Sequence, residues 1–192
     1  MTTAKWTFFQ AFLRSPKVVA SMIPSSPFLE RRVVRAAGLA SARVAVELGA
    51  GTGGTTRAML AAMPADSRLV AIERTPEFVG PLEAIGDPRL TVVNGCASAI
   101  VEELERLGLD RADAVVSGIP FSTLPPELSA TIAREVHRAL KPHGRFVAYQ
   151  FTDKVADFAR PVFGQPRVEH EIRNVPPLKV FTWEREAASA AA

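Results

Sequence analysis

Apolar residues follow two alternating patterns along this chain between positions 43 and 183. Short runs rich in apolar residues predict buried strands at 43–48, 68–73, 90–94, 114–117 and 145–151. Runs with helical character predict helices between the strands, at 54–63, 76–84, 97–107 and 125–140. Because strands that alternate with helices form βαβ units, we expect a mostly parallel sheet with helices on both faces.

The pattern changes after residue 151. A short helical stretch is predicted at 154–158, and two more strand-like runs follow, near 167–172 and 179–184. The segment that joins these two runs, Asn174-Val175-Pro176-Pro177, is too short for a helical crossover, so an antiparallel hairpin is expected. The whole pattern therefore predicts an α/β fold with seven strands, the last two forming an antiparallel pair.

The length and composition fit a single domain. The chain has 192 residues, 47% hydrophobic and 22% charged, which is ordinary for a globular protein with one core. It contains no run of about 18 uncharged apolar residues, and residues 1–12 lack the apolar region of a signal peptide, so we expect a cytoplasmic protein. The expected division is an N-terminal helical arm at 1–40, a core domain at 41–186 and a flexible tail at 187–192.

Metal chemistry is not expected from this sequence. Cys96 is the single cysteine, which excludes an internal disulfide and a cysteine-based metal site. The three histidines, His137, His143 and His170, do not have the spacing of metal ligands.

The N-terminal arm is basic and rich in aromatic residues. Residues 1–35 contain six lysines and arginines and one glutamate, a net charge of +5, so the rest of the chain carries −2. A helix here would gather apolar side chains on one face with cations beside them. The residues concerned are Lys5, Trp6, Phe8, Phe9, Phe12, Leu13, Arg14 and Lys17. This pattern is typical of a helix in an anionic membrane interface; the alternative is a helix that packs on the sheet or covers a ligand as a lid.

A glycine-rich loop follows the first predicted strand. Gly49, Gly51 and Gly53 precede a helix, where glycines permit a sharp turn and let a ligand lie against the backbone. Glu47, just before the loop, would repel a pyrophosphate and suits a cationic ligand such as S-adenosylmethionine. Glu73 ends the second strand, 20 residues after Gly53, where a carboxylate can accept hydrogen bonds from ribose hydroxyls. A purely structural turn, an ion-paired Glu47, a solvated Glu73 and dinucleotide binding stay open as alternatives.

These motifs resemble those of the seven-strand class I methyltransferases. The likeness runs from about residue 43 to 184 and rests on Glu47-Leu48-Gly49-Ala50-Gly51-Thr52-Gly53 and Ala71-Ile72-Glu73. It implies a Rossmann-like fold with S-adenosylmethionine as cofactor. In that family the loop after the third strand touches the adenine, and Cys96 stands where Asp is usual, although a thiol is a poor acceptor. The candidate cofactor-binding residues are Ser25, Ser26, Glu47, Gly49, Gly51, Thr52, Gly53, Glu73, Arg74, Gly95, Cys96, Ala97 and Ser117.

The loop after the fourth predicted strand is Ser117-Gly118-Ile119-Pro120-Phe121, at the ligand-binding end of such a sheet. Its backbone carbonyls and the Ser117 hydroxyl can orient the lone pair of an acceptor amine; a simple rigid turn is the alternative. The loop resembles motif IV of methyltransferases that act on exocyclic amines of bases. Gly118 stands where those enzymes have Asn or Asp, which argues against an RNA adenine substrate.

Several segments together resemble the bacterial phospholipid N-methyltransferases, which are similar to the ribosomal RNA adenine dimethyltransferases. The segments are Phe8-Phe9-Gln10-Ala11-Phe12-Leu13, Ile23-Pro24-Ser25-Ser26-Pro27-Phe28-Leu29, 117–121, Gln150-Phe151-Thr152 and Asn174-Val175-Pro176-Pro177. The resemblance implies stepwise methylation of phosphatidylethanolamine toward phosphatidylcholine at the inner face of the membrane. It places Ser25 and Ser26 near the amino-acid end of the cofactor. The candidate catalytic residues are Ser117, Ile119 and Tyr149.

Three other functions stay open at this point. They are an RNA adenine methyltransferase, a small-molecule amine methyltransferase whose arm is a lid, and a binding module that keeps the fold. The chain ends soon after the seventh predicted strand, so we expect no appended helical domain of the kind that such RNA enzymes carry, and aromatic stacking platforms are few. The expected partners are therefore an anionic membrane surface and an aminophospholipid, without nucleic acid or metal.

Overall fold

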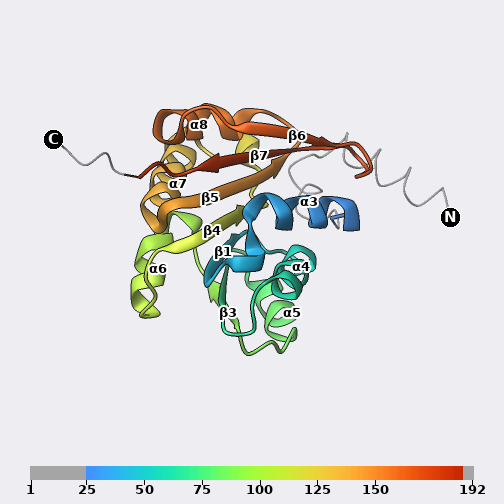
Figure 1. The fold of residues 1–192 in the computed structure, drawn as a ribbon, viewed down its shortest axis with the longest axis vertical. Helices are drawn as coiled ribbons and strands as arrows, with labels where there is room; N and C mark the ends of the chain where they lie inside the picture. Colours follow the sequence, from blue (N-terminus) through green and yellow to red (C-terminus); the bar gives the residue numbers. More distant parts are fainter. Residues whose placement is uncertain (1–24, 188–192) are drawn as a thin grey trace.

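Seven strands form one sheet in the order β3-β2-β1-β4-β5-β7-β6 (Figure 1). The computed structural model describes residues 25–187. The strands are β1 (Val44–Leu48), β2 (Arg68–Glu73), β3 (Leu90–Asn94), β4 (Ala112–Ser117), β5 (Leu140–Gln150), β6 (Arg167–Glu171) and β7 (Leu178–Glu184). The predicted seven-stranded, Rossmann-like α/β class is confirmed.

The strand directions also match the prediction. The strands β1 to β5 pair in parallel, whereas β7 runs antiparallel to both β5 and β6. The order of the strands reverses between β1 and β4, with β2 and β3 on one side and β5 on the other. Ligands of open α/β sheets bind at the carboxyl ends of the strands at such a switch point. The glycine loop after β1 and the loop 117–121 after β4 therefore meet where a ligand site is expected.

Helices cover both faces of the sheet (Figure 1). They are α3 (Pro27–Ala37), α4 (Gly54–Ala62), α5 (Val79–Glu83), α6 (Ile100–Arg106), α7 (Pro126–Ala139) and α8 (Lys154–Phe163). The helices predicted at 76–84 and 97–107 each begin with a 3-10 turn, at Pro76–Phe78 and Ala97–Ala99. The helix predicted at 154–158 is observed as the longer α8, because the buried face of this helix continues through Ala159.

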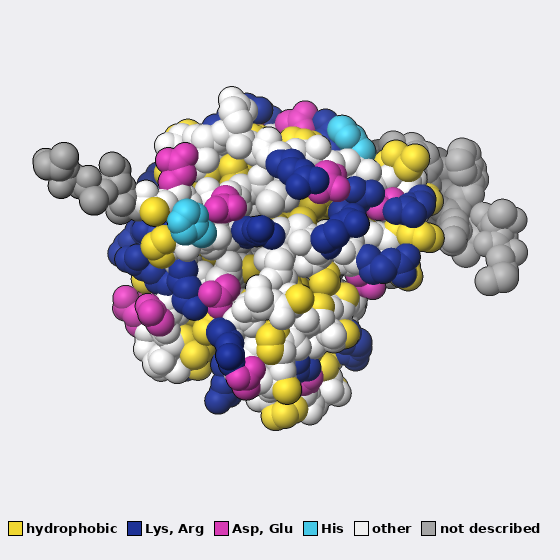
Figure 2. Space-filling model, viewed as in Figure 1, with side chains coloured by type: hydrophobic (Ala, Val, Ile, Leu, Met, Phe, Trp, Pro, Cys, Tyr) yellow, Lys and Arg dark blue, Asp and Glu magenta, His cyan; other side chains and the backbone are white. Residues whose placement is uncertain are grey.

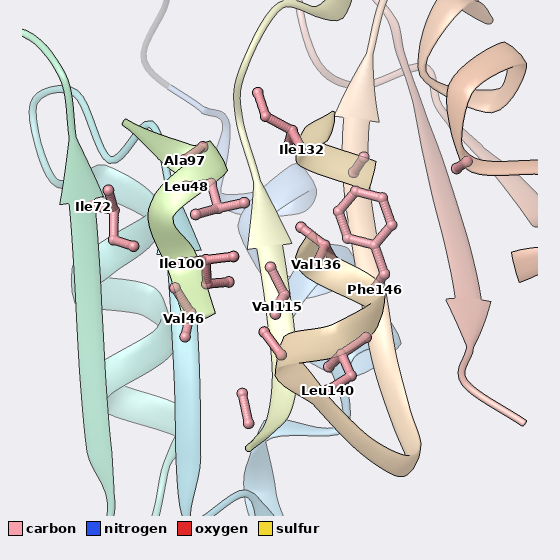
Figure 3. Close-up of a cluster of buried hydrophobic side chains, with 14 of the residues drawn as sticks. Val46, Leu48, Ile72, Ala97, Ile100, Val115, Ile132, Val136, Leu140 and Phe146 are labelled. Carbon is pink, nitrogen blue, oxygen red and sulfur yellow. The ribbon is translucent and has the colours of Figure 1, made fainter. Parts of the chain in front are cut away.

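One face of the sheet packs against α6, α7 and α8 (Figure 3). Val46 of β1 and Val115 of β4 are fully buried there against Ile100 of α6 and Val136 of α7. Phe146 of β5 extends this core toward Trp183 of β7, with the two rings stacked 5.2 Å apart. The strands are apolar on both faces because helices remove both faces from water.

The other face of the sheet packs against α3 and α4. Leu29, Val33 and Ala37 of α3 are buried in a second core that includes Ala45 of β1 and Val147 of β5. Ser26 begins α3 by accepting a hydrogen bond from the Leu29 N–H on its side chain, 3.2 Å away. The last part of the predicted arm therefore forms a helix of the core, while residues 1–24 lie outside the described residues, so the expected division at residue 40 stays a prediction.

The β5 strand begins earlier than predicted, at Leu140 instead of residue 145. Its first residues are polar and irregular, with His143 in the left-handed region at φ 62° and a shift in register opposite Ala112 and Ala114. The His143 N–H donates to the Arg185 carbonyl over 2.7 Å, which pairs this segment with the residue that follows β7. No apolar alternation marks such a segment in the sequence. Within residues 25–187, no helix is long and apolar enough to cross a membrane.

Candidate functional site

A cavity of about 250 Å³ lies at the switch point, between the loops that follow β1, β2, β3 and β4. Most of the predicted site residues line it, namely Ser25, Gly49, Gly51, Thr52, Glu73, Arg74, Gly95, Cys96, Ala97, Ile119 and Tyr149. Four predicted residues lie beside the cavity without lining it: Ser26, Glu47, Gly53 and Ser117. The predicted membrane-binding residues, from Lys5 to Lys17, lie outside the described part of the chain.

The glycine loop needs glycine for its backbone and for its close packing. Gly49 has φ 75° and Gly53 has φ 82°, both in the left-handed region that side chains disfavour. A Cβ at Gly49 would also lie 3.1 Å from Cγ1 of Ile119, so the loops after β1 and β4 can approach only with glycine there. The loop thus offers bare backbone to the cavity, which supports the prediction of a bound ligand.

Glu73 is held in one orientation by two backbone donors. Its Oε2 accepts from the Gly51 N–H over 2.9 Å, and its Oε1 accepts from the Thr75 N–H over 2.8 Å. The side chain is 6% exposed and lines the cavity. Because each carboxylate oxygen has a further lone pair, both remain able to accept ribose hydroxyls. The predicted role of Glu73 therefore fits its geometry.

Glu47 lies beneath the cavity in a fully buried position. The Thr56 hydroxyl donates to its Oε2 over 2.6 Å, whereas its Oε1 has no partner among the described residues. Burial raises the pKa of Glu47 to about 7, with a smaller contribution from Glu73 in the same direction, opposed by the Thr56 bond. An ionised, half-satisfied carboxylate at this depth is stabilised by a cation in the adjoining cavity. No ion pair to Glu47 is present among residues 25–187.

A chain of hydroxyl groups crosses one wall of the cavity. The Oγ of Ser25 lies 3.4 Å from Oγ1 of Thr55, which lies 3.3 Å from the Tyr149 hydroxyl. Burial and the Glu47 carboxylate raise the pKa of Tyr149 to about 12. Tyr149 therefore remains a neutral phenol that can accept or donate a hydrogen bond at the cavity.

The Tyr149 hydroxyl also explains the glycine at position 118. A Cβ on Gly118 would overlap the Tyr149 hydroxyl, and it would lie 3.0 Å from Cζ of the same ring and 3.2 Å from the Gly49 carbonyl oxygen. An asparagine or aspartate cannot be accommodated at Gly118 while Tyr149 holds this position. The polar group at this point of the cavity is thus a phenol from β5 instead of a motif IV amide.

The loop 117–121 is braced from below. Ser117 is fully buried, and its hydroxyl accepts a hydrogen bond from the Ile119 N–H over 3.3 Å. The prediction that this hydroxyl orients an acceptor amine in the cavity is therefore wrong, because Ser117 supports the loop and does not line the cavity. The side chain of Gln150 donates to the Ile119 carbonyl over 2.7 Å. Of the predicted catalytic residues, Ile119 and Tyr149 line the cavity.

The loop after β3 forms the opposite wall. The Gly95 N–H donates to the Glu73 carbonyl over 3.1 Å, and the Ser98 hydroxyl donates to Sγ of Cys96 over 3.1 Å. The thiol thus replaces the usual carboxylate at the cavity wall without bringing another charged acceptor. Apolar side chains continue this wall, namely Phe78, Leu124, Leu128 and Ile132. None of these four is among the predicted residues, and only Ile132 and Leu128 had a sequence signal, the apolar face of their helix.

Glu30 is a further carboxylate at the cavity that the sequence did not single out. It lies in the first turn of α3 and lines the cavity with Ser25. Burial raises its pKa above the ordinary value, and the neighbouring Arg31 opposes this shift. Glu30 reaches Gly54 at the start of α4, since a Cβ there would lie 3.3 Å from its Oε1. The cavity therefore has a carboxylate on the wall that the beginning of α3 forms, as well as the carboxylate of Glu73.

These residues fit S-adenosylmethionine, which carries an activated methyl group on a cationic sulfur. Glu73 can hold the ribose hydroxyls, the loop 95–97 and the apolar wall can hold the adenine, and the glycine loop leaves room for the backbone of the amino-acid part. The unpartnered oxygen of buried Glu47 matches a ligand with positive charge, which a pyrophosphate does not have. The described residues contain no cluster of metal-binding side chains.

Comparison with known proteins agrees with this site. Residues 45–144 match the family described as "Methyltransferase domain". An ornithine lipid N-methyltransferase from Singulisphaera acidiphila is 35% identical over 179 residues, which cover 91% of this chain and 92% of that protein. A ribosomal RNA small subunit methyltransferase H from Aromatoleum aromaticum is 45% identical over 73 residues, 38% of this chain and 23% of that protein.

A solved structure shares the fold at low sequence identity. It is that of the O-methyltransferase TomG from Streptomyces achromogenes in complex with S-adenosylmethionine, at 18% identity and a TM-score of 0.68 over 84% of this chain and 81% of that one. The family match, the near full-length relative and the cavity lead to the same conclusion. The chain belongs to the S-adenosylmethionine-dependent methyltransferases with the Rossmann-like fold.

Proposed function

We propose that this enzyme transfers methyl groups to the primary amine of a membrane aminolipid, with phosphatidylethanolamine as the first candidate, converted stepwise toward phosphatidylcholine. The observation that carries the proposal is the likeness to an ornithine lipid N-methyltransferase along nearly the whole of both chains. Both head groups present an aliphatic primary amine on a lipid. This shared chemistry is the substrate class, and the experiment below distinguishes the two lipids.

The charges around the cavity suit an aliphatic amine, which is a cation before it reacts. Glu30 and Glu73 line the cavity, and Glu47 lies beneath it. Carboxylates attract the ammonium form of the head group into the cavity. The amine must then lose a proton to expose its lone pair, and Glu30, whose pKa burial raises, is placed to accept that proton.

The neutral side chains around the cavity can then orient the amine. The Tyr149 hydroxyl accepts a hydrogen bond from the amine and fixes the direction of its lone pair. Ile119, with its carbonyl held by Gln150, forms the rigid floor on the side of β4.

The geometry at Gly118 argues against an adenine as the acceptor. A motif IV side chain that would accept from the amino group of a base has no room beside Tyr149. The matches to ribosomal RNA small subunit methyltransferases also cover 38% to 56% of this chain, against 91% for the ornithine lipid N-methyltransferase. A phenol and a buried carboxylate make a site for a small flexible amine more readily than for a planar base.

The arm provides a route to the membrane in this proposal. Its net charge of +5 over residues 1–35 favours the anionic inner face, where the enzyme would bind peripherally. Deletion of residues 1–15 is expected to reduce sedimentation with anionic vesicles, more strongly at low salt, because exposed charges are screened within about 8 Å at physiological ionic strength. Equal sedimentation of the truncated and full chains would contradict this role.

The substrate test uses methyl-labelled S-adenosylmethionine and vesicles of an anionic lipid mixed with either phosphatidylethanolamine or ornithine lipid. Lipids are separated after incubation, and parallel reactions contain free ethanolamine or ribosomal RNA. The Glu73→Ala variant, which removes the carboxylate assigned to the ribose hydroxyls, is the control for cofactor-dependent labelling. Label in mono-, di- or trimethylated lipid would support the proposal and identify the head group. Label in RNA or free amine, with none in lipid, would overturn it.

A further inference from the structure

Exposed apolar side chains are concentrated at one end of the described structure. The large hydrophobic residues that are exposed within residues 25–187 are Phe28 (39%), Val168 (40%), Ile172 (75%) and Val175 (63%). Phe28 lies in the first turn of α3, and Ile172 and Val175 lie in the turn between β6 and β7. Figure 1 shows this turn and the beginning of α3 at the same end of the molecule. We call Phe28, Arg31, Ile172, Arg173 and Val175 the tip surface.

The turn is fixed to α3 by buried polar groups and is not a loose loop. Asn174, 1% exposed, accepts from the Ser26 N–H over 3.0 Å and donates to the Pro176 carbonyl over 2.8 Å. Glu171, also 1% exposed, forms ion pairs with Arg32 and Arg173, and these arginines hold its pKa at about 2. Ile172 and Val175 are therefore presented outward by a rigid support, although burial would be favourable for both.

Cations surround the apolar side chains of the tip surface. The guanidinium carbons of Arg31 and Arg173 lie 4.9 Å and 4.2 Å from the centre of the Phe28 ring. The helix α3 and the segment 167–179 together carry six arginines and lysines against three glutamates. Figure 2 shows Lys and Arg side chains next to hydrophobic ones at this end of the visible face. Aliphatic groups that enter the acyl boundary, with arginines at head-group level, are typical of a membrane interface.

The tip surface lies next to the wall of the cavity. Ser25 and Glu30 line the cavity, and they stand on either side of Phe28 in the chain. The Ser26 bond to Asn174 joins this wall directly to the β6–β7 turn. A lipid whose head group occupies the cavity keeps its acyl chains in the membrane, so a membrane-binding surface must lie close to the cavity wall.

We propose that the tip surface is a second membrane-docking site, separate from the N-terminal arm, which binds an anionic bilayer with Ile172 and Val175 inserted at the level of the acyl boundary. This inference rests on the proposed function, the methylation of a membrane aminolipid. Arg31 and Arg173 contact anionic head groups, and the rigid turn sets the cavity wall against the surface. The arm supplies affinity, whereas the tip surface supplies orientation.

The test is vesicle sedimentation of the full chain without cofactor, on phosphatidylcholine vesicles with and without phosphatidylglycerol. Neither lipid has a primary amine on an ethanolamine or ornithine head group, so binding is measured independently of the methylation proposal. The double variant Ile172→Ser with Val175→Ser is expected to lower partitioning about thirtyfold, since insertion of each branched side chain stabilises binding by about 1 kcal/mol. The matched control is Val168→Ser, an exposed valine on β6 outside the tip surface.

Two further measurements test the charge of the tip surface and the activity of the double variant. Arg31→Gln, on the exposed side of α3, is expected to weaken binding about fivefold on anionic vesicles and to leave neutral vesicles unchanged, because one cation near an anionic surface contributes about 1 kcal/mol. Methylation of aminolipid in detergent micelles is expected to stay near that of the unmodified enzyme for the double variant. Unchanged partitioning of the double variant, or an equal loss with Val168→Ser, would overturn the proposal. The proposal would also be overturned if the double variant lost binding to an RNA probe while its vesicle binding stayed intact.

Discussion

The buried carboxyl group of Glu47 predicts a specific pH dependence of stability, which Glu47→Gln should remove. Burial raises the pKa of Glu47 from 4.5 to about 7 in the folded protein. The folded state then holds a proton more tightly than the unfolded chain does. The stability that this group contributes is therefore fully present below about pH 4.5 and is lost as the pH rises through about 7.

The expected size of the effect follows from the two pKa values. The full loss between the protonated and ionised limits is about 3 kcal/mol, of which about 2.5 kcal/mol falls between about pH 5 and about pH 8.5. Glutamine is uncharged at every pH and can keep the bond from the Thr56 hydroxyl. Its amide nitrogen takes the place of Oε1, which has no hydrogen-bond partner among the described residues, and any cost of burying this uncharged group does not vary with pH.

The assay is urea denaturation of both proteins without cofactor at several pH values. The free energy of unfolding of Glu47→Gln, minus that of the unmodified chain, is expected to become more positive by about 2.5 kcal/mol from about pH 5 to about pH 8.5. This change corresponds to a relative shift of about 1 M in urea midpoint in favour of the variant. Titrations of groups that do not interact with Glu47 cancel in this difference. Parallel curves, with a difference that is independent of pH, would refute the assignment of a raised pKa to Glu47.

Three further predictions concern the walls of the cavity. Glu73→Gln keeps one acceptor oxygen but loses the charge, and we expect cofactor binding to weaken by about 1.5 kcal/mol or more by calorimetry; unchanged affinity would remove Glu73 from the ribose site. Cys96→Asp supplies the acceptor that the family usually has, and cofactor affinity is expected to rise about tenfold, with the stronger acceptor bond as the reason. Equal or lower affinity would show that the adenine is held by stacking and backbone alone. Gly118→Ala is expected to destabilise by about 1–3 kcal/mol through overlap with Tyr149 and to be partly relieved in a Tyr149→Phe background; additive losses in thermal denaturation would contradict the contact.

The parts of the fold that the sequence predicts best are two of the parallel strands, β2 and β3. The prediction for β2 and β3 matches the observed bounds, because both are short apolar runs that end at polar loop residues. The first residues of β5 are missed, since Lys141-Pro142-His143-Gly144 has the composition of a turn and lies at a shift in register against β4. Hydrophobic periodicity records burial, so a strand segment that is not buried leaves no such record.

The site is predictable where topology alone brings residues together. Loops that follow parallel strands meet at one edge of the sheet, which places Gly49, Glu73 and Ile119 around one cavity without knowledge of the packing. Glu30 and the contact of Tyr149 with Gly118 are not predictable in this way. They depend on how α3 and the end of β5 pack, across separations in sequence that leave no local pattern.

The distribution of charge links the cavity to its proposed substrate. The carboxylates at the cavity, Glu30, Glu47 and Glu73, outnumber its one lining arginine, Arg74, among the described residues. Arg31 and Arg173 make the adjoining tip surface basic. A free soluble amine approaches past these cations and gains little from long-range attraction. An amine carried on an anionic membrane meets the opposite situation, because the bilayer is attracted by the cations and the head group is then delivered to the carboxylates. Added salt should therefore reduce methylation of vesicle-bound aminolipid more steeply than methylation of the same head group in neutral micelles.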